Sequence, residues 1–374
     1  MPARLPTRTA SALAPILLAA AVRIAGADAP GSAGFSVETL APGIHALVRT
    51  KLPGFFLDSN VLFVVNDEDV VVVDANLTPA SAEASIAALR QLTPKPVRYL
   101  VNTHRHHDHV GGNEVYRREF PGVEIVGSAA MHDDLEAFGK STMDGWTGWA
   151  AEMAAVIPKH LANGTGLAGE PLSAEERASL EADLAAARAL VADAPRMHVV
   201  APTLTVTDRL TLRRSLGSTA RTIEILALGK GHTRGDLVVW LQEERIAATG
   251  DLLVAPVPLV GGDQSYVEEW LATFDRLRTL GATTYLPGHG AVQRSDGQLV
   301  LYREFLGSVV EQTRAAMARG LSADEAASTI DLASFRDRMA GESPVLRMLF
   351  ANWGRVPAVT AIYRQRDEAK SAAP

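Results

Sequence analysis

Four imidazole side chains and one carboxylate lie within six residues of this chain, between positions 104 and 109. Histidine and aspartate are the ligands that suit zinc and related divalent cations. In an extended segment, His104 and His106 are two residues apart and point to the same side. Asp108 and His109 follow after a bend and can face a second ion, and the glycine pair at 111–112 lets the backbone turn away sharply. The alternative is a solvated loop that is rich in histidine by accident.

Three candidate ligands further along the chain share one placement, because each follows the carboxyl end of a predicted strand. They are His232 after 223–228, Asp251 after 245–249 and His289 after 284–286. Asp74 ends a predicted strand at 69–73 in the same way. In α/β sheets, ligand sites form at the edge where the carboxyl ends of the strands meet. We therefore expect these side chains to converge on the histidine cluster, which an accidental loop would not explain.

Strand-forming and helix-forming segments alternate along the rest of the chain. A hairpin is expected from 60–65 and 69–75, and one strand from 204–213. Between about 130 and 198 the strand composition nearly vanishes, and Ser173 and Glu176 predict a capping box. We interpret this segment as a mostly helical insertion.

The clearest predicted helix spans 265–280. Ser265 and Glu268 predict a capping box at its start, and its apolar residues fall on one face. Helices are also expected from about 299 onward, so that 297–374 forms a C-terminal helical extension. Two successive blocks of strands and helices suggest a layered α/β architecture in which helices cover two sheets.

Residues 1–29 have the composition of a signal peptide. Arg4 and Arg8 give a positive start, residues 10–22 are apolar, and small residues then offer cleavage triplets. We therefore expect a periplasmic or secreted protein, without a membrane span in the mature chain, since no later apolar stretch is long enough. The chain has no cysteine, which excludes thiolate-based sites, and its net charge of −7 argues against a nucleic-acid partner.

The order of these motifs resembles that of the metallo-β-lactamase-fold hydrolases. The pattern H-x-H-x-D-H is followed by Gly-His-Thr, Thr-Gly-Asp and Pro-Gly-His-Gly, and the resemblance extends from about residue 35 to residue 292. It implies a four-layer αββα sandwich that occupies residues 30–296, apart from the helical insertion. The pattern is specific for the fold and not for the substrate.

The resemblance also implies a role for each candidate residue. His104, His106 and His232 would bind one metal ion, while Asp108, His109 and His289 would bind a second. Asp251 would bridge the two ions, which are expected to be Zn2+, with iron or manganese as alternatives. Asp108 would also be catalytic, by orienting the attacking hydroxide between the metals and moving a proton. Asp74 would support a ligand histidine from behind, although a plain strand-end carboxylate is the alternative.

The expected function is that of a binuclear zinc-dependent hydrolase acting on a small-molecule ester, lactone, thioester, sulfate ester or β-lactam. An aspartate at the bridging position resembles the thioesterase, lactonase and arylsulfatase-type relatives more than the β-lactamases that use Cys or Ser there. A β-lactamase proper is one alternative, and it needs a polar clamp for the substrate carboxylate. An iron-dependent oxidoreductase of the same fold is another, but the di-iron relatives have Glu in place of His106.

Other side chains near the predicted ligands are candidates for contact with the substrate. Arg105, Lys230 and Arg234 flank the ligands and are candidates for attracting an anionic substrate, or are solvated charges. The insertion falls where a lid would cover the site, and its apolar residues are candidates for a substrate pocket or for ordinary core; they are Met143, Trp146, Trp149 and Met153. The C-terminal helices could dock on the body or form a homodimer contact.

Overall fold

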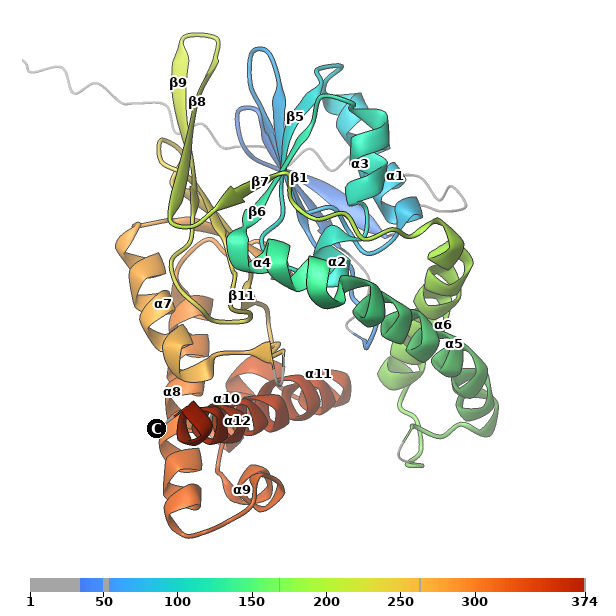
Figure 1. Ribbon diagram of the computed structural model, residues 1–374. Coiled ribbons are helices and arrows are strands. Elements are labelled where there is room, and N and C mark those ends of the chain that lie inside the picture. Colours follow the sequence, from blue (N-terminus) through green and yellow to red (C-terminus); the bar gives the residue numbers. More distant parts are fainter. Residues whose placement is uncertain (1–33, 50–53, 168, 262–263, 373–374) are drawn as a thin grey trace, which may run out of the picture.

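Two β-sheets form the centre of the protein, as seen in the computed structural model of Figure 1. The structure describes residues 34–49, 54–167, 169–261 and 264–372, so the predicted signal peptide lies outside the described residues. The first sheet has the spatial order β1-β2-β3-β4-β5-β6-β7, with bounds Phe35–Ala41, Ile44–Arg49, Val61–Val65, Val70–Val73, Val97–Val101, Glu124–Ser128 and Leu204–Val206. The second has the order β12-β11-β10-β9-β8, with bounds Thr284–His289, Ile246–Val254, Val238–Leu241, Thr219–Leu226 and Arg209–Leu216.

The central strands are apolar on both sides because both faces of each sheet are covered. Every residue of β3 (VLFVV) and β4 (VVVV) is buried, and these two strands form the predicted antiparallel hairpin. β4 to β7 then run parallel to one another. The facing sides of the two sheets share one core, which includes Leu62, Val64, Val71, Ile223, Ile225, Val239 and Leu286.

Helices cover the outer face of each sheet. On the first sheet lie α1 (Pro79–Leu92) and α3 (Asn113–Glu119); α1 begins with a capping box at Thr78 and a proline, which suits the first turn. On the second lie α7 (Val267–Thr279), α8 (Gly297–Ala318) and the C-terminal helices α9 (Ala323–Thr329), α10 (Ala333–Ala340), α11 (Pro344–Leu349), the π-helix η4 (Phe350–Arg355) and α12 (Val356–Ala372). The predicted four-layer αββα architecture with C-terminal helices is therefore confirmed.

The chain between β6 and β7 forms a group of helices that projects to one side of the molecule (Figure 1). It contains α4 (Ala129–Asp134), the π-helix η1 (Leu135–Gly139), α5 (Lys140–Asn163), α6 (Ala174–Asp193) and the short 3-10 helix η2 (Ala194–Arg196). The capping box predicted at Ser173 and Glu176 is present at the start of α6. In the described part of the chain, none of the helices is long and apolar enough to span a bilayer.

Two local predictions were wrong. The single strand expected at 204–213 is two strands, β7 and β8, which belong to different sheets, because the chain crosses between the sheets at residues 207–208. The capping box expected at Ser265 is absent, since α7 begins after Tyr266 and makes no side-chain cap. The Ser265 hydroxyl instead donates to the His232 carbonyl oxygen at 2.9 Å and accepts from the Gly261 amide.

The packing of α7 against the second sheet predicts a large stability effect at Leu277, whose side chain is fully buried. Leu277→Ala should lower the free energy of unfolding by about 2–5 kcal/mol, because it leaves a cavity in the core. Leu204→Ala is the matched control, since Leu204 is 36% exposed, and it should cost less than about 1 kcal/mol. Chemical denaturation would measure both, and equal losses would contradict this view of the core.

Candidate metal centre

The seven predicted ligands come from four separate segments and lie together at one end of the sheets. His104 and His106 follow β5, while Asp108 and His109 lie in the short helix α2 (His107–Val110). They meet His232, Asp251 and His289 in two groups of four, with the ligand atoms of each group within 4.8 Å of one another. One group is His104, His106, His232 and Asp251; the other is Asp108, His109, Asp251 and His289.

Asp251 belongs to both groups, and each of its carboxylate oxygens faces one of them. Oδ2 lies 3.4 Å from His232 Nε2 and 3.8 Å from His104 Nε2. Oδ1 lies 3.3 Å from His109 Nε2 and 3.4 Å from His289 Nε2. This is the geometry expected of a bridging ligand. The sequence predicted that Asp251 follows the end of a strand. In the structure it lies inside β11 instead, at an irregularity in the pairing of β11 with β12.

The close approach of unpartnered ligand atoms fits divalent cations. His106 Nδ1 lies 3.0 Å from His104 Nε2 and 2.9 Å from His232 Nε2. Three imidazole nitrogens at such distances need a cation or shared protons between them. Among the described residues, His109 Nε2, His289 Nε2 and Asp251 Oδ1 are buried and make no hydrogen bond. Buried polar atoms without partners are costly, so these atoms are suited to coordinating an ion. Imidazole and carboxylate donors without thiolate suit Zn2+ and, less selectively, iron or manganese.

Asp74 supports the ligands from behind. Its Oδ2 lies 2.8 Å from His109 Nδ1, and its Oδ1 accepts the amide hydrogen of Thr103 at 2.8 Å. The Thr103 hydroxyl contacts Asp74 Oδ2 at 2.9 Å and His104 Nδ1 at 3.1 Å, so one carboxylate orients an imidazole from each group. Asp74 has a φ of 66°, a left-handed conformation that is strained in residues other than glycine and often occurs at functional sites.

The remaining ligand imidazoles also have fixed orientations. His232 Nδ1 lies 3.1 Å from the Leu259 carbonyl oxygen, and His289 Nδ1 lies 3.2 Å from the Asp58 carbonyl oxygen. Both place Nε2 toward the ligand groups. His106 is reversed, because its Nε2 contacts Gln264 Oε1 at 2.9 Å and leaves Nδ1 for the site. Sequence reasoning missed these supporting groups, since two are backbone carbonyls and nothing in the local sequence distinguishes Gln264.

Asn60 holds the backbone on both sides of His289. Its side-chain amide donates to the carbonyl oxygens of Pro287 at 2.9 Å and Gly290 at 2.8 Å. Its backbone amide donates to the Gly288 carbonyl oxygen at 2.8 Å. This side chain therefore fixes the position of a ligand from the opposite sheet, although its place in an apolar strand gave no functional signal.

Burial and neighbouring charge divide the imidazoles into two electrostatic classes. Burial lowers the pKa of His232 to about 3 and that of His106 to about 4, which favours the neutral form that binds metal. For His289, burial alone would lower the pKa, but the Asp251 and Asp108 carboxylates raise it to about 10. The second group therefore attracts positive charge, whether it is carried by a proton or by a metal ion.

Three glycines near the site lie so close to other atoms that a side chain would not fit there. A Cβ atom on Gly288 would lie 1.9 Å from Asp251 Oδ1, so a larger residue would displace the bridging carboxylate. The glycine pair at 111–112 was expected to allow a sharp turn, but both residues have negative φ. Their role is instead to let the backbone pass close to the Leu77 and Ala75 carbonyl oxygens, which a Cβ would approach to 2.0 and 2.1 Å.

The cationic side chains that flank the ligands are paired within the protein. Arg105 is buried and pairs with Asp134 at 3.1 Å, and Arg234 pairs with the same carboxylate. Lys230 Nζ lies 3.2 Å from a Glu269 carboxylate oxygen. The candidates for attracting an anionic substrate therefore already have acidic partners, which argues for structural roles.

The apolar side chains of the insertion pack mainly against the segment at 54–56. Trp149 stacks on Phe56 with ring centroids 4.4 Å apart, and Met143 and Met153 join the same cluster. Trp146 is 38% exposed. None of these four predicted pocket residues lines the cavity of about 800 Å3 that opens beside His289, which is lined instead by α6 and the C-terminal helices.

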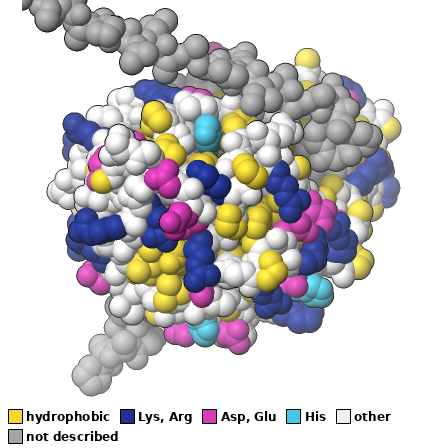
Figure 2. All heavy atoms as spheres, turned by 90° about the horizontal axis from the view of Figure 1, so that it is seen from above, with side chains coloured by type: hydrophobic (Ala, Val, Ile, Leu, Met, Phe, Trp, Pro, Cys, Tyr) yellow, Lys and Arg dark blue, Asp and Glu magenta, His cyan; other side chains and the backbone are white. Residues whose placement is uncertain are grey.

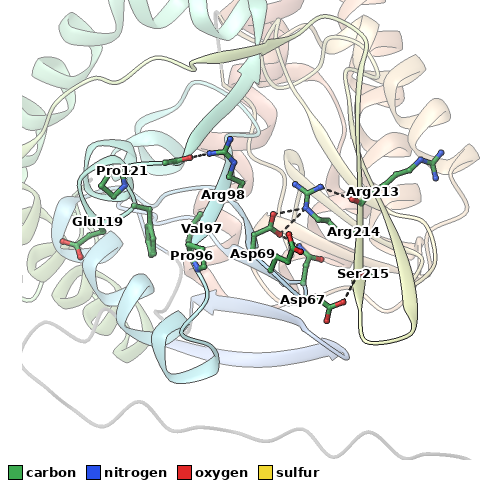
Figure 3. A pocket seen from close by; sticks show the side chains of 14 residues that line it. Asp67, Asp69, Pro96, Val97, Arg98, Glu119, Pro121, Arg213, Arg214 and Ser215 are labelled. Carbon is green, nitrogen blue, oxygen red and sulfur yellow. Dashed lines mark hydrogen bonds and ion pairs between the residues drawn. The ribbon is translucent and has the colours of Figure 1, made fainter.

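A larger hollow of about 1050 Å3 lies at the opposite end of the first sheet, beside the start of β5 (Figure 3). Two of its basic side chains have partners within the protein, since Arg214 Nε lies 2.9 Å from Asp69 Oδ2 and Arg98 donates to the Gly122 carbonyl oxygen. Figure 2, which views the molecule from the top of Figure 1, shows basic and acidic side chains interspersed on that face. The ligand groups follow the other end of β5, so this hollow is separate from the metal centre.

The chain is similar to several known proteins. The family model of the metallo-beta-lactamase superfamily matches residues 54–289. The linear primary-alkylsulfatase of a Pseudomonas species is 24% identical over 292 residues, which cover 75% of this chain and 51% of that protein. The hydroxyacylglutathione hydrolase of a Nostoc species is 38% identical over 73 residues, which cover 20% of this chain and 28% of that protein. A solved metallo-beta-lactamase from Pontibacter korlensis has 19% identity and a TM-score of 0.49, covering 73% of this chain and 99% of its own.

The two facing sheets and the paired His/Asp groups define a protein with a metal-binding site at the end of an αββα sandwich. The chain belongs to the metallo-beta-lactamase superfamily, whose model matches more than half of it. It spans about half the length of the alkylsulfatase and less than a third of the hydroxyacylglutathione hydrolase.

The position of Asp74 behind His109 and Thr103 predicts an effect on metal affinity. Asp74→Asn should weaken zinc binding by about 10- to 100-fold, because it removes the negative charge that orients a ligand imidazole. Competition with a chromogenic chelator would measure the affinity. Asp133→Asn is a matched control, since that carboxylate side chain is 71% exposed. Equal affinities for the two variants would refute the supporting role.

The raised pKa of His289 predicts that zinc binding releases protons. Because this pKa is about 10, the metal-free imidazole carries a proton near neutral pH, and zinc needs the neutral form. Apparent zinc affinity should therefore increase as the pH rises toward that pKa. Calorimetry in two buffers with different ionisation enthalpies would count the protons, and His198→Ala, at an exposed histidine, should leave the count unchanged. Identical heats in both buffers would contradict the prediction.

Proposed function

We propose that this protein is a binuclear zinc-dependent hydrolase acting on a small-molecule ester, lactone, thioester or sulfate ester. The observation that carries the proposal is the Asp251 carboxylate, whose two oxygens face two separate groups of ligand atoms. His104, His106 and His232 would hold one ion, and Asp108, His109 and His289 would hold the other. When bound, two such ions lower the pKa of a water molecule and polarise the oxygen of the bond to be cleaved.

Asp108 is the residue best placed to handle a proton during hydrolysis. Its side chain is 18% exposed, whereas that of Asp251 is 1% exposed, so it is the more accessible of the two carboxylates. Its Oδ2 lies 3.0 Å from His289 Nε2 and 3.4 Å from His109 Nε2, which ties it to the second group. We assign to Asp108 the orientation of the attacking water and the transfer of its proton toward the leaving group.

The relatives support hydrolysis of ester-type bonds. The two relatives reported above on sequence identity are named as an alkylsulfatase and a hydroxyacylglutathione hydrolase, and the alkylsulfatase aligns with most of this chain. A β-lactamase proper is less favoured, because the residue between the two ligand groups is Asp251, whereas many β-lactamases of this fold use Cys or Ser at the bridging position. The presence of His106 in the first group favours a hydrolase over the di-iron relatives. Export to the periplasm or medium, inferred from residues 1–29, is part of the same proposal.

The ligand assignments predict the outcome of an activity screen on zinc-loaded protein. The protein should hydrolyse at least one substrate in a panel of aryl ester, lactone, thioester, aryl sulfate and β-lactam. His106→Ala and Asp108→Asn should lower kcat/KM by about 100-fold or more while circular dichroism shows an intact fold. His198→Ala, at an exposed histidine, is the matched control and should keep full activity.

Metal content measured alongside would separate the alternatives. Zinc with hydrolysis supports the proposal, whereas iron with oxygen consumption favours an oxidoreductase. Saturating metal without turnover of any substrate would favour a metal-binding protein that is not an enzyme. Full activity of His106→Ala would refute the assigned ligand set.

A further inference from the structure

An apolar cavity of about 800 Å3 lies between the helical insertion and the C-terminal helices and opens beside the metal centre. Figure 1 shows α6 and α11 approaching each other below the sheets, and the two helices are in contact. The volume is within the range of small-molecule sites, which are about 300–1,000 Å3. The cavity therefore has the size and position of a substrate pocket.

The wall formed by α6 consists of small side chains. Four alanines line the cavity, Ala182, Ala185, Ala186 and Ala189, and their spacing of three or four residues places them on one face of the helix. The opposite wall is larger and apolar, with Leu346 and Leu349 from α11 and Trp353 from η4. Methyl groups on one side and large side chains on the other leave a space between the helices that is bounded by hydrocarbon.

Apart from His289, the polar side chains in the lining have partners within the protein. Arg49 pairs with Asp58 at 2.9 Å, and Thr78 and Ser81 form hydrogen bonds with each other. Since these groups are already satisfied, most of the surface offered to an occupant is apolar. A ligand would therefore be recognised by burial of hydrocarbon rather than by hydrogen bonds.

One lining residue connects the cavity to the ligand groups. His289 borders the cavity, is 5% exposed, and has an Nε2 that makes no hydrogen bond and faces Asp108 and Asp251. An apolar chain in the cavity would thus place the group at its end beside His289. A solvent-exposed apolar groove elsewhere on the surface would not have this connection.

Polar contacts at the rim hold the walls in place. Asp183 of α6 accepts hydrogen bonds from the backbone amides of Phe55 at 2.9 Å and Phe56 at 3.0 Å. Ser343, which caps α11, forms a hydrogen bond with Glu175 in the first turn of α6. The cavity is therefore formed before a ligand binds, which reduces the entropy cost of binding.

We propose that this cavity binds an unbranched aliphatic chain of the substrate, so that the protein hydrolyses esters of medium-chain acids in preference to short ones. The proposal rests on the hydrolase function argued above. Hydrolysis would add the water oxygen to the acyl carbon and break its bond to the ester oxygen. The products are the alcohol or phenol, the carboxylate and a proton.

The test compares zinc-loaded protein on p-nitrophenyl acetate, hexanoate and decanoate. We expect kcat/KM to rise by about fourfold for each added methylene until the cavity is filled, which corresponds to the transfer of buried CH2 groups. Ala186→Phe should lower the ratio of kcat/KM for decanoate to that for acetate by at least about tenfold, since the ring occupies the cavity. Leu346→Phe tests the same effect from the opposite wall.

Ala192→Phe is the matched control, because Ala192 is an exposed residue of α6 that does not line the cavity. It should keep the chain-length preference of the parent protein. Calorimetric titration with sodium decanoate gives a readout that does not depend on turnover. Decanoate should bind the parent and Ala192→Phe with equal affinity and should bind Ala186→Phe and Leu346→Phe about tenfold more weakly.

The outcomes separate this inference from the proposed function. Hydrolysis of the acetate ester with no gain from longer chains would overturn the inference and leave the hydrolase function intact. If no ester is hydrolysed, the proposed activity on carboxylic esters fails, and decanoate binding decides whether the cavity takes an aliphatic chain. Equal decanoate affinity in the parent and both cavity variants would also overturn it.

Discussion

The candidate metal centre depends on the carboxylate of Asp251, which lies where the two ligand groups meet. A buried carboxylate in an apolar sheet is unfavourable unless positive charge surrounds it. Burial alone would raise the pKa of Asp251, but His289 and His109 hold it well below its usual range. Each oxygen is directed to a different group, so the side chain can serve two cations only in the orientation that β11 gives it. The glycine at 288 and the pairing irregularity in β11 both serve that orientation.

Much of the fold could be predicted from the sequence because periodicity and local capping determine many of its elements. The run at 70–73 is apolar on both faces, which indicates a strand covered on both sides, and α6 begins at the capping box that Ser173 and Glu176 provide. Two of the errors, at Ser265 and at the break between β7 and β8, have a tertiary cause. Ser265 has the right spacing for a cap, but its hydroxyl is used by the His232 carbonyl. The break between β7 and β8 reflects a crossing between sheets, which the alternation of residues within one strand does not reveal.

The ligand candidates could also be identified from the sequence, because histidine and aspartate next to glycine at strand ends are unusual enough to be noticed individually. Their roles as ligands remain predictions, whereas their proximity is a property of the structure. The groups that orient them were largely invisible, since Leu259 and Asp58 contribute backbone carbonyls and Asn60 acts from the other sheet. For the apolar residues of the insertion, the structure favours ordinary core over a substrate pocket. Large aromatic residues in α5 suggested a pocket, but they pack on Phe56, and the space is created by alanines, whose small size carries no sequence signal.

Asp134 connects the helical insertion to the candidate metal centre. Its carboxylate pairs with Arg105, which lies between two ligands of the first group, and with Arg234, which lies two residues after a third. The base of the insertion is therefore bound through Asp134 to both loops that carry this group. Without that negative charge, the buried Arg105 guanidinium would lose its acidic partner between two of the candidate ligands. A residue outside the predicted ligand set thus balances a positive charge that lies between two of its members.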